Sequence, residues 1–299
     1  METKLHTLPN SNLQYEHYVP ARQISPYPIL LVHGMFGGSW QFFLAIEHLL
    51  RHGFEVYALN LDGHAPGQTV GSSSLNDYVN DTIAMLWHIS RPTILVGHSM
   101  GGLIAQIVAE SLSEKREEEK SDPLVKAAVF MSSVVPGKRV FVLQMLHPRY
   151  ILAMIKEKPF HIIPKHVCAL HMNRTPHREQ YLSRLQPGSG LALKELVAAS
   201  TKVDARDVAC PTLVIGAEHD IITPTCTQFG LAERYHSTYR YTYGGDHMTF
   251  MWSVEPMEHI IRWESPNCFQ IFGELLYLQT FRQLLVQQLK SHPLASHTI

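Results

Sequence analysis

Short apolar runs alternate with amphipathic stretches along most of this chain. The runs rich in β-branched and aliphatic residues are residues 28–32, 54–59, 93–96, 126–132 and 210–216. Such runs suit strands buried on both faces of a parallel sheet, whereas residues 13–19 and 238–243 alternate between apolar and polar positions, as half-exposed outer strands do. The pattern predicts an α/β fold with a mostly parallel central sheet flanked by helices.

Capping residues mark where the helices between these runs begin and end. Ser74-Leu75-Asn76-Asp77 fits a capping box, and apolar residues then recur at helical spacing. Ser39 is placed to cap a helix that ends near Gly53. These signals predict one helix before the strand at 54–59 and another before the strand at 93–96.

Two amphipathic stretches follow the last predicted strand. Residues 254–263 predict the helix that closes the fold. Residues 272–289 form a further stretch of this kind, which either packs back on the body or makes a homodimer contact, and the sequence does not decide between the two.

The chain is organised around a strand-to-helix turn at Gly97-His98-Ser99-Met100-Gly101. This is the G-x-S-x-G pattern, which holds a serine on a sharp turn with its hydroxyl clear of the sheet. A side chain at either glycine would crowd the neighbouring strand or helix. The pattern alone also fits an ordinary tight turn of another α/β protein, so it needs support from other motifs.

Three further motifs supply that support in chain order: HGMFGG at residues 33–38, GAEHD at 216–220 and GGDH at 244–247. With these, the chain resembles the serine hydrolases of the α/β-hydrolase superfamily, near the esterase and monoacylglycerol-lipase-like members, over residues 28–263. The resemblance implies an α/β-hydrolase fold. One departure from the family pattern is Ala65, which replaces the last glycine of a D-x-x-G-H-G loop, and we interpret His64 there as structural.

The resemblance also assigns site residues. It implies Ser99 as nucleophile, Asp220 as the acid that orients the base, and His247 as the base, in the family's chain order. The backbone N–H groups of Met35 and Met100 are expected to form the oxyanion hole. Motif residues with an expected structural role are His33, Gly34, Gly97, His98 and Gly101. Asp220 could instead cap the next helix, and weaker alternatives for the base are His219, His236 and His259.

The alternation of strand and helix stops between residues 133 and 203. No strand-length run appears there, and helical patterns replace it, so we predict an inserted helical cap at 133–203 and a core domain at 1–132 and 204–299. Apolar residues of the cap are candidates for lining an acyl pocket, although any folded cap must bury such residues. These candidates are Phe141, Leu143, Met145, Leu146, Ile151, Met154 and Ile155.

The charge of the predicted cap says more about possible substrates than the total charge of the chain does. The cap has 11 lysines and arginines against three glutamates, while the whole chain has a net charge of −1. A basic cap raises the local concentration of anionic substrates or carriers, although surface lysines often only face water. The total charge predicts no nucleic-acid partner.

Composition bounds the cofactors and the compartment. Four cysteines without C-x-x-C spacing, no secretory leader and no long apolar run predict a cytoplasmic protein with no transmembrane segment. Nineteen histidines raise the question of a metal. Because H-E-x-x-H is missing, and because the histidines from 161 to 177 are spaced too widely to share a helix face, we predict neither a metal nor a cofactor.

The predicted function is hydrolysis of a small-molecule carboxylic ester through a Ser-His-Asp triad and an acyl-enzyme. An alternative is a thioesterase or acyltransferase acting on acyl groups carried by coenzyme A or an acidic carrier protein, for which the basic cap is the motive. Carbon–carbon bond hydrolysis, cofactor-free haloperoxidase chemistry and a non-catalytic ligand receptor are weaker alternatives, because the same fold and similar triads serve them.

Overall fold

The computed structural model describes residues 5–119, 123–137 and 147–264. The chain divides into a compact unit, Met1–Ile260, and a second unit, Ile261–Ile299, of which only the first four residues are described. The predicted amphipathic stretch at 272–289 lies outside the described residues, so its role stays a prediction.

The centre of the fold is a mostly parallel sheet with the strand order β1-β2-β4-β3-β5-β6-β7-β8. β1 and β2 run antiparallel to their neighbours, and the strands from β4 to β8 pair in parallel. The bounds are β1 (Leu5–Thr7), β2 (Gln14–Tyr18), β3 (Ile29–Val32), β4 (Val56–Asn60), β5 (Thr93–His98), β6 (Val125–Met131), β7 (Thr212–Ala217) and β8 (Thr238–Thr242). The predicted α/β fold is confirmed, and β1 is an outer strand that the sequence analysis missed.

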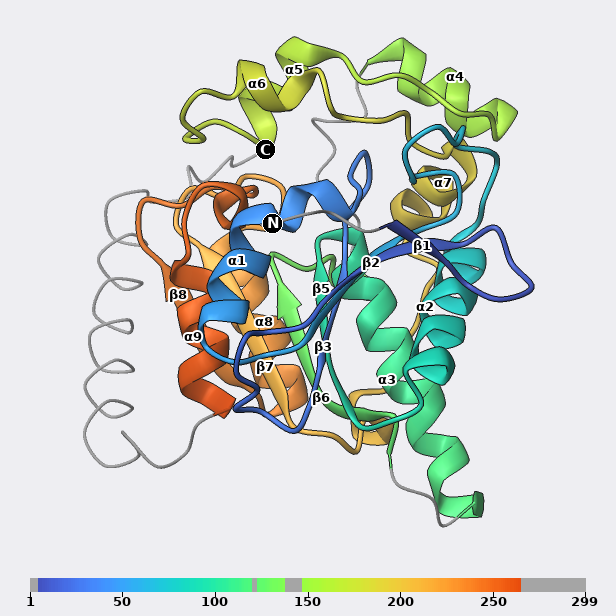
Figure 1. The fold of residues 1–299 in the computed structure, drawn as a ribbon. Helices are drawn as coiled ribbons and strands as arrows, with labels where there is room; N and C mark the ends of the chain where they lie inside the picture. The colour runs from blue at the N-terminus through green and yellow to red at the C-terminus, as the bar shows by residue number, and fades with distance from the viewer. Residues whose placement is uncertain (1–4, 120–122, 138–146, 265–299) are drawn as a thin grey trace, which may run out of the picture. The chain divides into compact units, whose positions relative to one another are not determined.

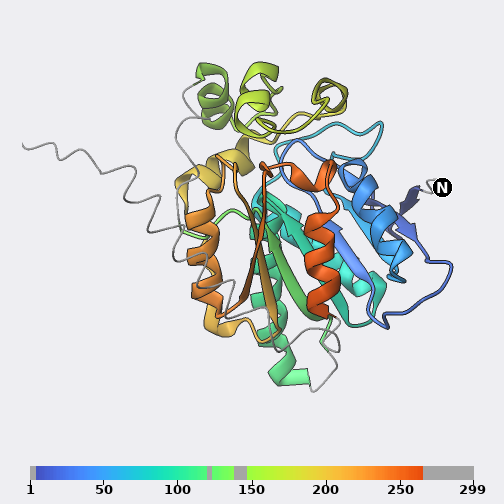
Figure 2. The same cartoon turned by 90° about the vertical axis from the view of Figure 1, so that its left-hand side faces the viewer.

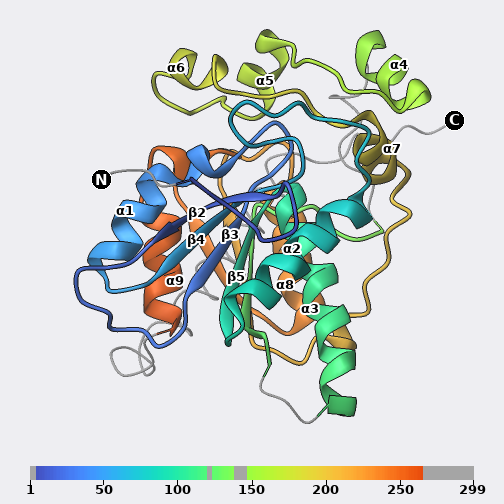
Figure 3. The same cartoon turned by 45° about the vertical axis from the view of Figure 1, so that its right-hand side comes forward.

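Helices cover both faces of this sheet (Figures 1 and 3). α1 and α9 lie on one face, and α2, α3 and α8 lie on the other. Every residue of β3 and β5 is buried, as the apolar runs predicted for strands covered on both sides. The bounds are α1 (Phe43–Arg51), α2 (Leu75–Ile89), α3 (Met100–Glu119), α8 (Thr225–Tyr235) and α9 (Glu255–Glu264).

Two of the predicted helix starts have different outcomes. Ser74 caps α2, its side chain accepting from the N–H of Asp77, so the predicted capping box is present. Ser39 does not act as a cap, because it is the first residue of a 3₁₀ turn, Ser39–Phe42, and its own N–H donates to the side chain of Asn60. The acceptor at the start of this turn is therefore the side chain of Asn60, 21 residues away, which the local sequence did not predict.

Short helices replace the alternating pattern between β6 and β7. They are α4 (Pro148–Lys156), α5 (Pro164–Leu170), α6 (Glu179–Leu182) and α7 (Gly190–Ala198). Figure 2 shows α4, α5 and α6 above one end of the sheet. Residues 138–146 of the predicted cap lie outside the described residues, and we keep the division into core and cap as a proposal; "cap" below means residues 147–203.

Candidate active site

Ser99 lies on the sharp turn between β5 and α3. Its φ angle is 56°, in the left-handed region that side-chain-bearing residues rarely adopt. A Cβ added to Gly97 would lie 2.1 Å from the carbonyl oxygen of Gly101, and one added to Gly101 would lie 2.3 Å from that of Val32. Only glycine fits at these two positions, so the backbone can turn tightly enough to hold the serine above the strand end.

Three side chains from the ends of three strands meet at this turn. The Ser99 hydroxyl lies 2.9 Å from Nε2 of His247, and Nδ1 of the same ring donates to Oδ2 of Asp220 at 2.9 Å. Because a carboxylate only accepts, Nδ1 carries the proton and Nε2 is left to accept from the hydroxyl. The side chains of His247 and Asp220 are 1% and 0% exposed, so water does not compete for this contact.

The two carboxylate oxygens of Asp220 accept hydrogen bonds from different donors. Oδ1 accepts from the N–H groups of Ile222 and Thr223, and Oδ2 takes the hydroxyl of Thr223 as well as the imidazole. Burial alone would raise the pKa of this carboxyl, but the facing imidazole and these donors hold the pKa below its ordinary value. Asp220 therefore holds the turn that precedes α8 as well as the imidazole, but it does not cap the helix, because α8 begins at Thr225 with Pro224 at the N-cap position and no side-chain cap.

The glycine-rich loop after β3 passes directly beside Ser99. A Cβ added to Gly34 would lie 2.9 Å from the Cβ of Ser99, and both Met35 and Met100 line the pocket into which the serine opens. The N–H of Met100 is in the first turn of α3, where backbone N–H groups have no partner within the helix. Both predicted oxyanion donors thus belong to residues bordering the serine, and their role remains a proposal.

Buried histidines hold this loop in place. His33 donates from Nδ1 to the carbonyl of Gly34 and accepts from the N–H of Leu61, while His64 donates from Nδ1 to the carbonyl of Gly37. Burial lowers the pKa of His33 to about 3, with the neighbouring His64 adding to the effect, and burial lowers that of His64 to about 4. Both rings are neutral at physiological pH and act as hydrogen-bonding struts.

His98 supports the loop that carries the predicted base. Its Nε2 donates to the backbone carbonyl of His247 at 2.8 Å. Burial and the nearby His247 ring lower the pKa of His98 well below its ordinary value. The histidine in G-x-S-x-G therefore links the turn that carries Ser99 to the loop that carries His247.

A pocket with mostly apolar walls opens at Ser99. No lysine or arginine among the described residues lines it. Ile151, Met154 and Ile155, predicted as lining candidates, do not border it, and Ile155 is 73% exposed; Phe141, Leu143, Met145 and Leu146 lie outside the described residues. The cap side chains that do line it are Tyr150, Phe160, His166, Val167, Leu170, His171, Leu193, Leu196 and Val197.

His171, at the end of α5, is a site residue that the sequence analysis missed. Its ring lies edge-on to that of His247, with 5.2 Å between centroids, and it also lines the pocket. Burial and the neighbouring His247 lower the pKa of His171 to about 3. The ring is therefore neutral at physiological pH and adds no charge beside His247.

Asp246 was also missed as a functional candidate. The residue is fully buried, and Oδ2 accepts from the backbone N–H groups of Arg174 and Thr175 at 2.8 and 2.6 Å and from the hydroxyl of Thr175. Oδ1 accepts from the N–H of Met248. The carboxylate thus joins the cap to the loop that carries His247.

The weaker candidates for the base lie elsewhere. His219 lies 3.9 Å from Glu218, His236 ends α8, and His259 on α9 contacts the carbonyl of Tyr241. Of the four candidate histidines, His247 is the one that contacts Ser99.

A family model described as the alpha/beta hydrolase family matches residues 29–258. The chain belongs to the alpha/beta hydrolase family. No curated protein matches it significantly by sequence.

Solved structures resemble this alpha/beta hydrolase over most of its length. They include a thermophilic esterase from Thermogutta terrifontis (17% identity, 88% of this chain and 98% of that chain, TM-score 0.66) and a monoacylglycerol lipase from Paleococcus ferrophilus (20%, 85% and 98%, 0.61). The thioesterase domain from the curacin biosynthetic pathway matches at 14% identity over 87% and 99% with a TM-score of 0.62. At such identities the likeness establishes the fold, and the family supports a hydrolase. None of the helices in the described residues has the length and apolarity needed to span a bilayer.

Proposed function

We propose that this hydrolase cleaves carboxylic esters through Ser99, His247 and Asp220. The observation that carries the proposal is the unbroken chain of two 2.9 Å contacts from the Ser99 hydroxyl through both nitrogens of His247 to Asp220. A serine hydroxyl is a weak nucleophile at neutral pH, and an oriented, buried imidazole is the group that activates it.

The proposed reaction follows from these positions. His247 takes the hydroxyl proton as Ser99 Oγ bonds to the substrate carbonyl carbon, and Asp220 stabilises the imidazolium. The N–H groups of Met35 and Met100 receive the negative oxygen, each worth about 3 kcal/mol by analogy with other oxyanion holes. The tetrahedral adduct collapses, the ester C–O bond breaks, and His247 returns the proton to the leaving alcohol. Water then attacks the acyl-enzyme with the same proton transfers and releases the acid.

The pocket supports an apolar acyl group as the substrate portion next to Ser99. Its walls are aromatic and aliphatic, and each buried CH₂ of an acyl chain gains about 0.8 kcal/mol in such surroundings. A substrate charge placed there would meet no described lysine or arginine. We therefore expect neutral esters to be preferred over esters with a charged acyl group.

Labelling of the nucleophile tests the proposal. The wild type should react covalently with an alkyl fluorophosphonate, with the modified peptide containing Ser99, and Ser99→Ala should neither label nor retain more than about 10⁻⁴ of the turnover. His247→Gln should fold but lose labelling speed by a similar factor. Labelling that persists in Ser99→Ala would refute the assignment.

One observation favours a thioester substrate as a second candidate. Several basic residues of the cap are exposed and do not line the pocket, among them Lys156, Lys158 and Lys165. They could attract an acidic carrier protein without entering the pocket. The kcat/KM for a carrier-bound thioester would then fall steeply as ionic strength rises, whereas that for a neutral ester would not.

A further inference from the structure

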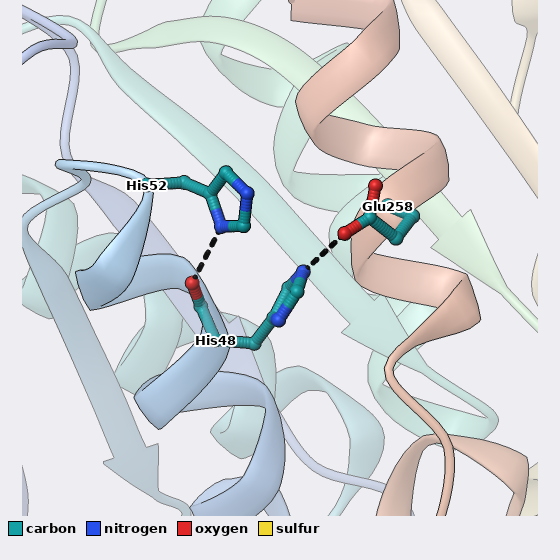
Figure 4. Close-up of side chains that lie close together, drawn as sticks. All are labelled: His48, His52 and Glu258. Carbon is teal, nitrogen blue, oxygen red and sulfur yellow. Dashed lines mark hydrogen bonds and ion pairs between the residues drawn. The ribbon is translucent and has the colours of Figure 1, made fainter.

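Two histidines and a glutamate meet on the face of the sheet that α1 and α9 cover. His48 and His52 belong to α1 and its end, and Glu258 belongs to α9 (Figure 4). One ligand atom from each of the three lies within 4.8 Å of the others. The cluster is separate from the candidate active site, since none of its members lines the pocket at Ser99.

The orientation of His52 favours metal binding over simple packing. Its Nδ1 donates to the backbone carbonyl of His48 at 2.9 Å, so the proton is on Nδ1 and Nε2 carries a lone pair. Metal-binding histidines typically donate their other ring N–H to a carbonyl in this way, which fixes the ring and its tautomer. The spacing i, i+4 also brings the two rings to the same side of α1, with 4.5 Å between centroids.

The contact between His48 and Glu258 supplies the other two ligands. Nε2 of His48 lies 2.6 Å from Oε1 of Glu258, and the two side chains are 14% and 29% exposed. A tetrahedral ion with bonds of about 2.1 Å needs ligand atoms about 3.4 Å apart. Zinc would take the place of the proton that Nε2 of His48 now donates to Glu258, and the ring would change to its Nδ1–H tautomer. The histidine and carboxylate would separate slightly and His52 would move inward, changes that partly exposed side chains make by rotation.

We propose that His48, His52 and Glu258 bind one divalent transition-metal ion, with zinc as the best fit and water as the fourth ligand. Two imidazoles and a carboxylate suit zinc, whereas magnesium and calcium require mostly oxygen ligands. The ion would connect α1, which follows the loop containing Met35, to α9, which follows the loop containing His247. By binding side chains of both helices, the ion would hold α1 and α9 together. The proposed metal site does not depend on the proposed function.

Metal titration of the intact protein tests this site. After removal of metals by a chelator, zinc at about 100 times its dissociation constant should raise the melting temperature by about 5 °C, and calorimetry should find one ion per chain. Cobalt should give the visible absorption of a tetrahedral ion with nitrogen and oxygen ligands. His52→Gln keeps the pair of His48 and Glu258 but removes one ligand, so it should lose the temperature shift and the cobalt band.

Controls separate this site from the other histidines and from cysteine. His161→Gln, at an exposed position in the cap, should respond to zinc as the wild type does. Glu258→Gln provides a second test of the ligand set should His52→Gln fold poorly. If His52→Gln and the wild type respond equally, or if cobalt shows a thiolate charge-transfer band from Cys168 or Cys226, the proposal is refuted and the cluster is an ion pair only.

Discussion

Replacing Asp246 with asparagine should loosen the cap without touching the groups proposed for catalysis. The carboxylate accepts three hydrogen bonds from Arg174 and Thr175 of the cap through Oδ2. Oδ1 accepts from the N–H of Met248 and, at 3.5 Å, from the indole N–H of Trp252. Asparagine has the same shape but offers one acceptor oxygen. The amide oxygen can accept either the hydrogen bonds from the cap or those from the loop. The NH₂ group of the asparagine then points at the remaining N–H donors, with which it cannot form hydrogen bonds.

The magnitude follows from counting these bonds. With the amide oxygen turned to the cap, three bonds to a charged acceptor become bonds to a neutral one, each losing about 0.5–1.5 kcal/mol, and the N–H of Met248 loses its acceptor at a cost of about 1–3 kcal/mol. The asparagine recovers part of this because it avoids burying a charge. We expect the free energy of unfolding to fall by about 3 kcal/mol.

Urea unfolding and hydrogen exchange measure the two parts of this effect. The unfolding midpoint should fall with an unchanged m value. The amides of Arg174 and Thr175 should exchange much faster in Asp246→Asn, while those of β3 and β5 change only as far as global stability does. Thr175→Val, which removes only the hydroxyl donor, should cost about 1 kcal/mol.

Asp207→Asn is the matched control, since Asp207 is exposed and should leave both measurements unchanged. If Asp246→Asn unfolds at the wild-type urea concentration and the two cap amides keep their protection, the carboxylate does not hold the cap.

Three further predictions concern the buried His64, the turn at Gly101 and the wall of the pocket. His64 takes up a proton below about pH 6.5 in the unfolded chain but only below about pH 4 in the folded chain, so protonation of the unfolded chain lowers stability by about 2 kcal/mol between pH 7.5 and pH 5.0. In urea titrations, the difference in free energy of unfolding between the wild type and His64→Gln should therefore shrink by that amount over this range. A difference that stays constant would contradict the prediction. Gly101→Ala should lower stability by at least about 2 kcal/mol in the same assay, because its Cβ would lie 2.3 Å from the carbonyl oxygen of Val32, and a change below about 0.5 kcal/mol would contradict the packing argument. Leu193→Ala, in the pocket wall, should move the preferred acyl chain of an ester series to greater length, and an unchanged preference would place the acyl group elsewhere.

The strands were predictable where burial leaves a continuous signature. β3, β5 and β7 are buried on both faces, and each is a run of apolar residues that no helix period explains. β1 was missed because its three residues sit at the sheet edge and alternate between exposed and half-buried positions. So short an exposed strand is specified by its partner, β2, and not by its own sequence.

The candidate site was predictable where one motif positions one residue. Ser99 follows from two glycines that permit its turn, and Asp220 and His247 follow from strand ends in the family's chain order. The residues that line the pocket were not predictable, because helical periodicity in the cap does not show which face of each helix is turned toward the sheet. Ile155 is apolar and exposed, whereas Phe160, only five residues later, is buried in the pocket wall. His171 and Asp246 gain their roles from contacts across more than 70 residues of chain, which no local pattern records.

The histidines around Ser99 differ chiefly in what their ring nitrogens face. His33, His64 and His98 each donate to a backbone carbonyl, and burial lowers the pKa of all three. His247 instead donates from Nδ1 to a buried carboxylate, Asp220, which stabilises the imidazolium during the proposed reaction. A charge on any of the others would repel the imidazolium that the proposed reaction forms. Keeping the surrounding rings neutral therefore confines the positive charge to the one imidazole that also contacts the serine hydroxyl.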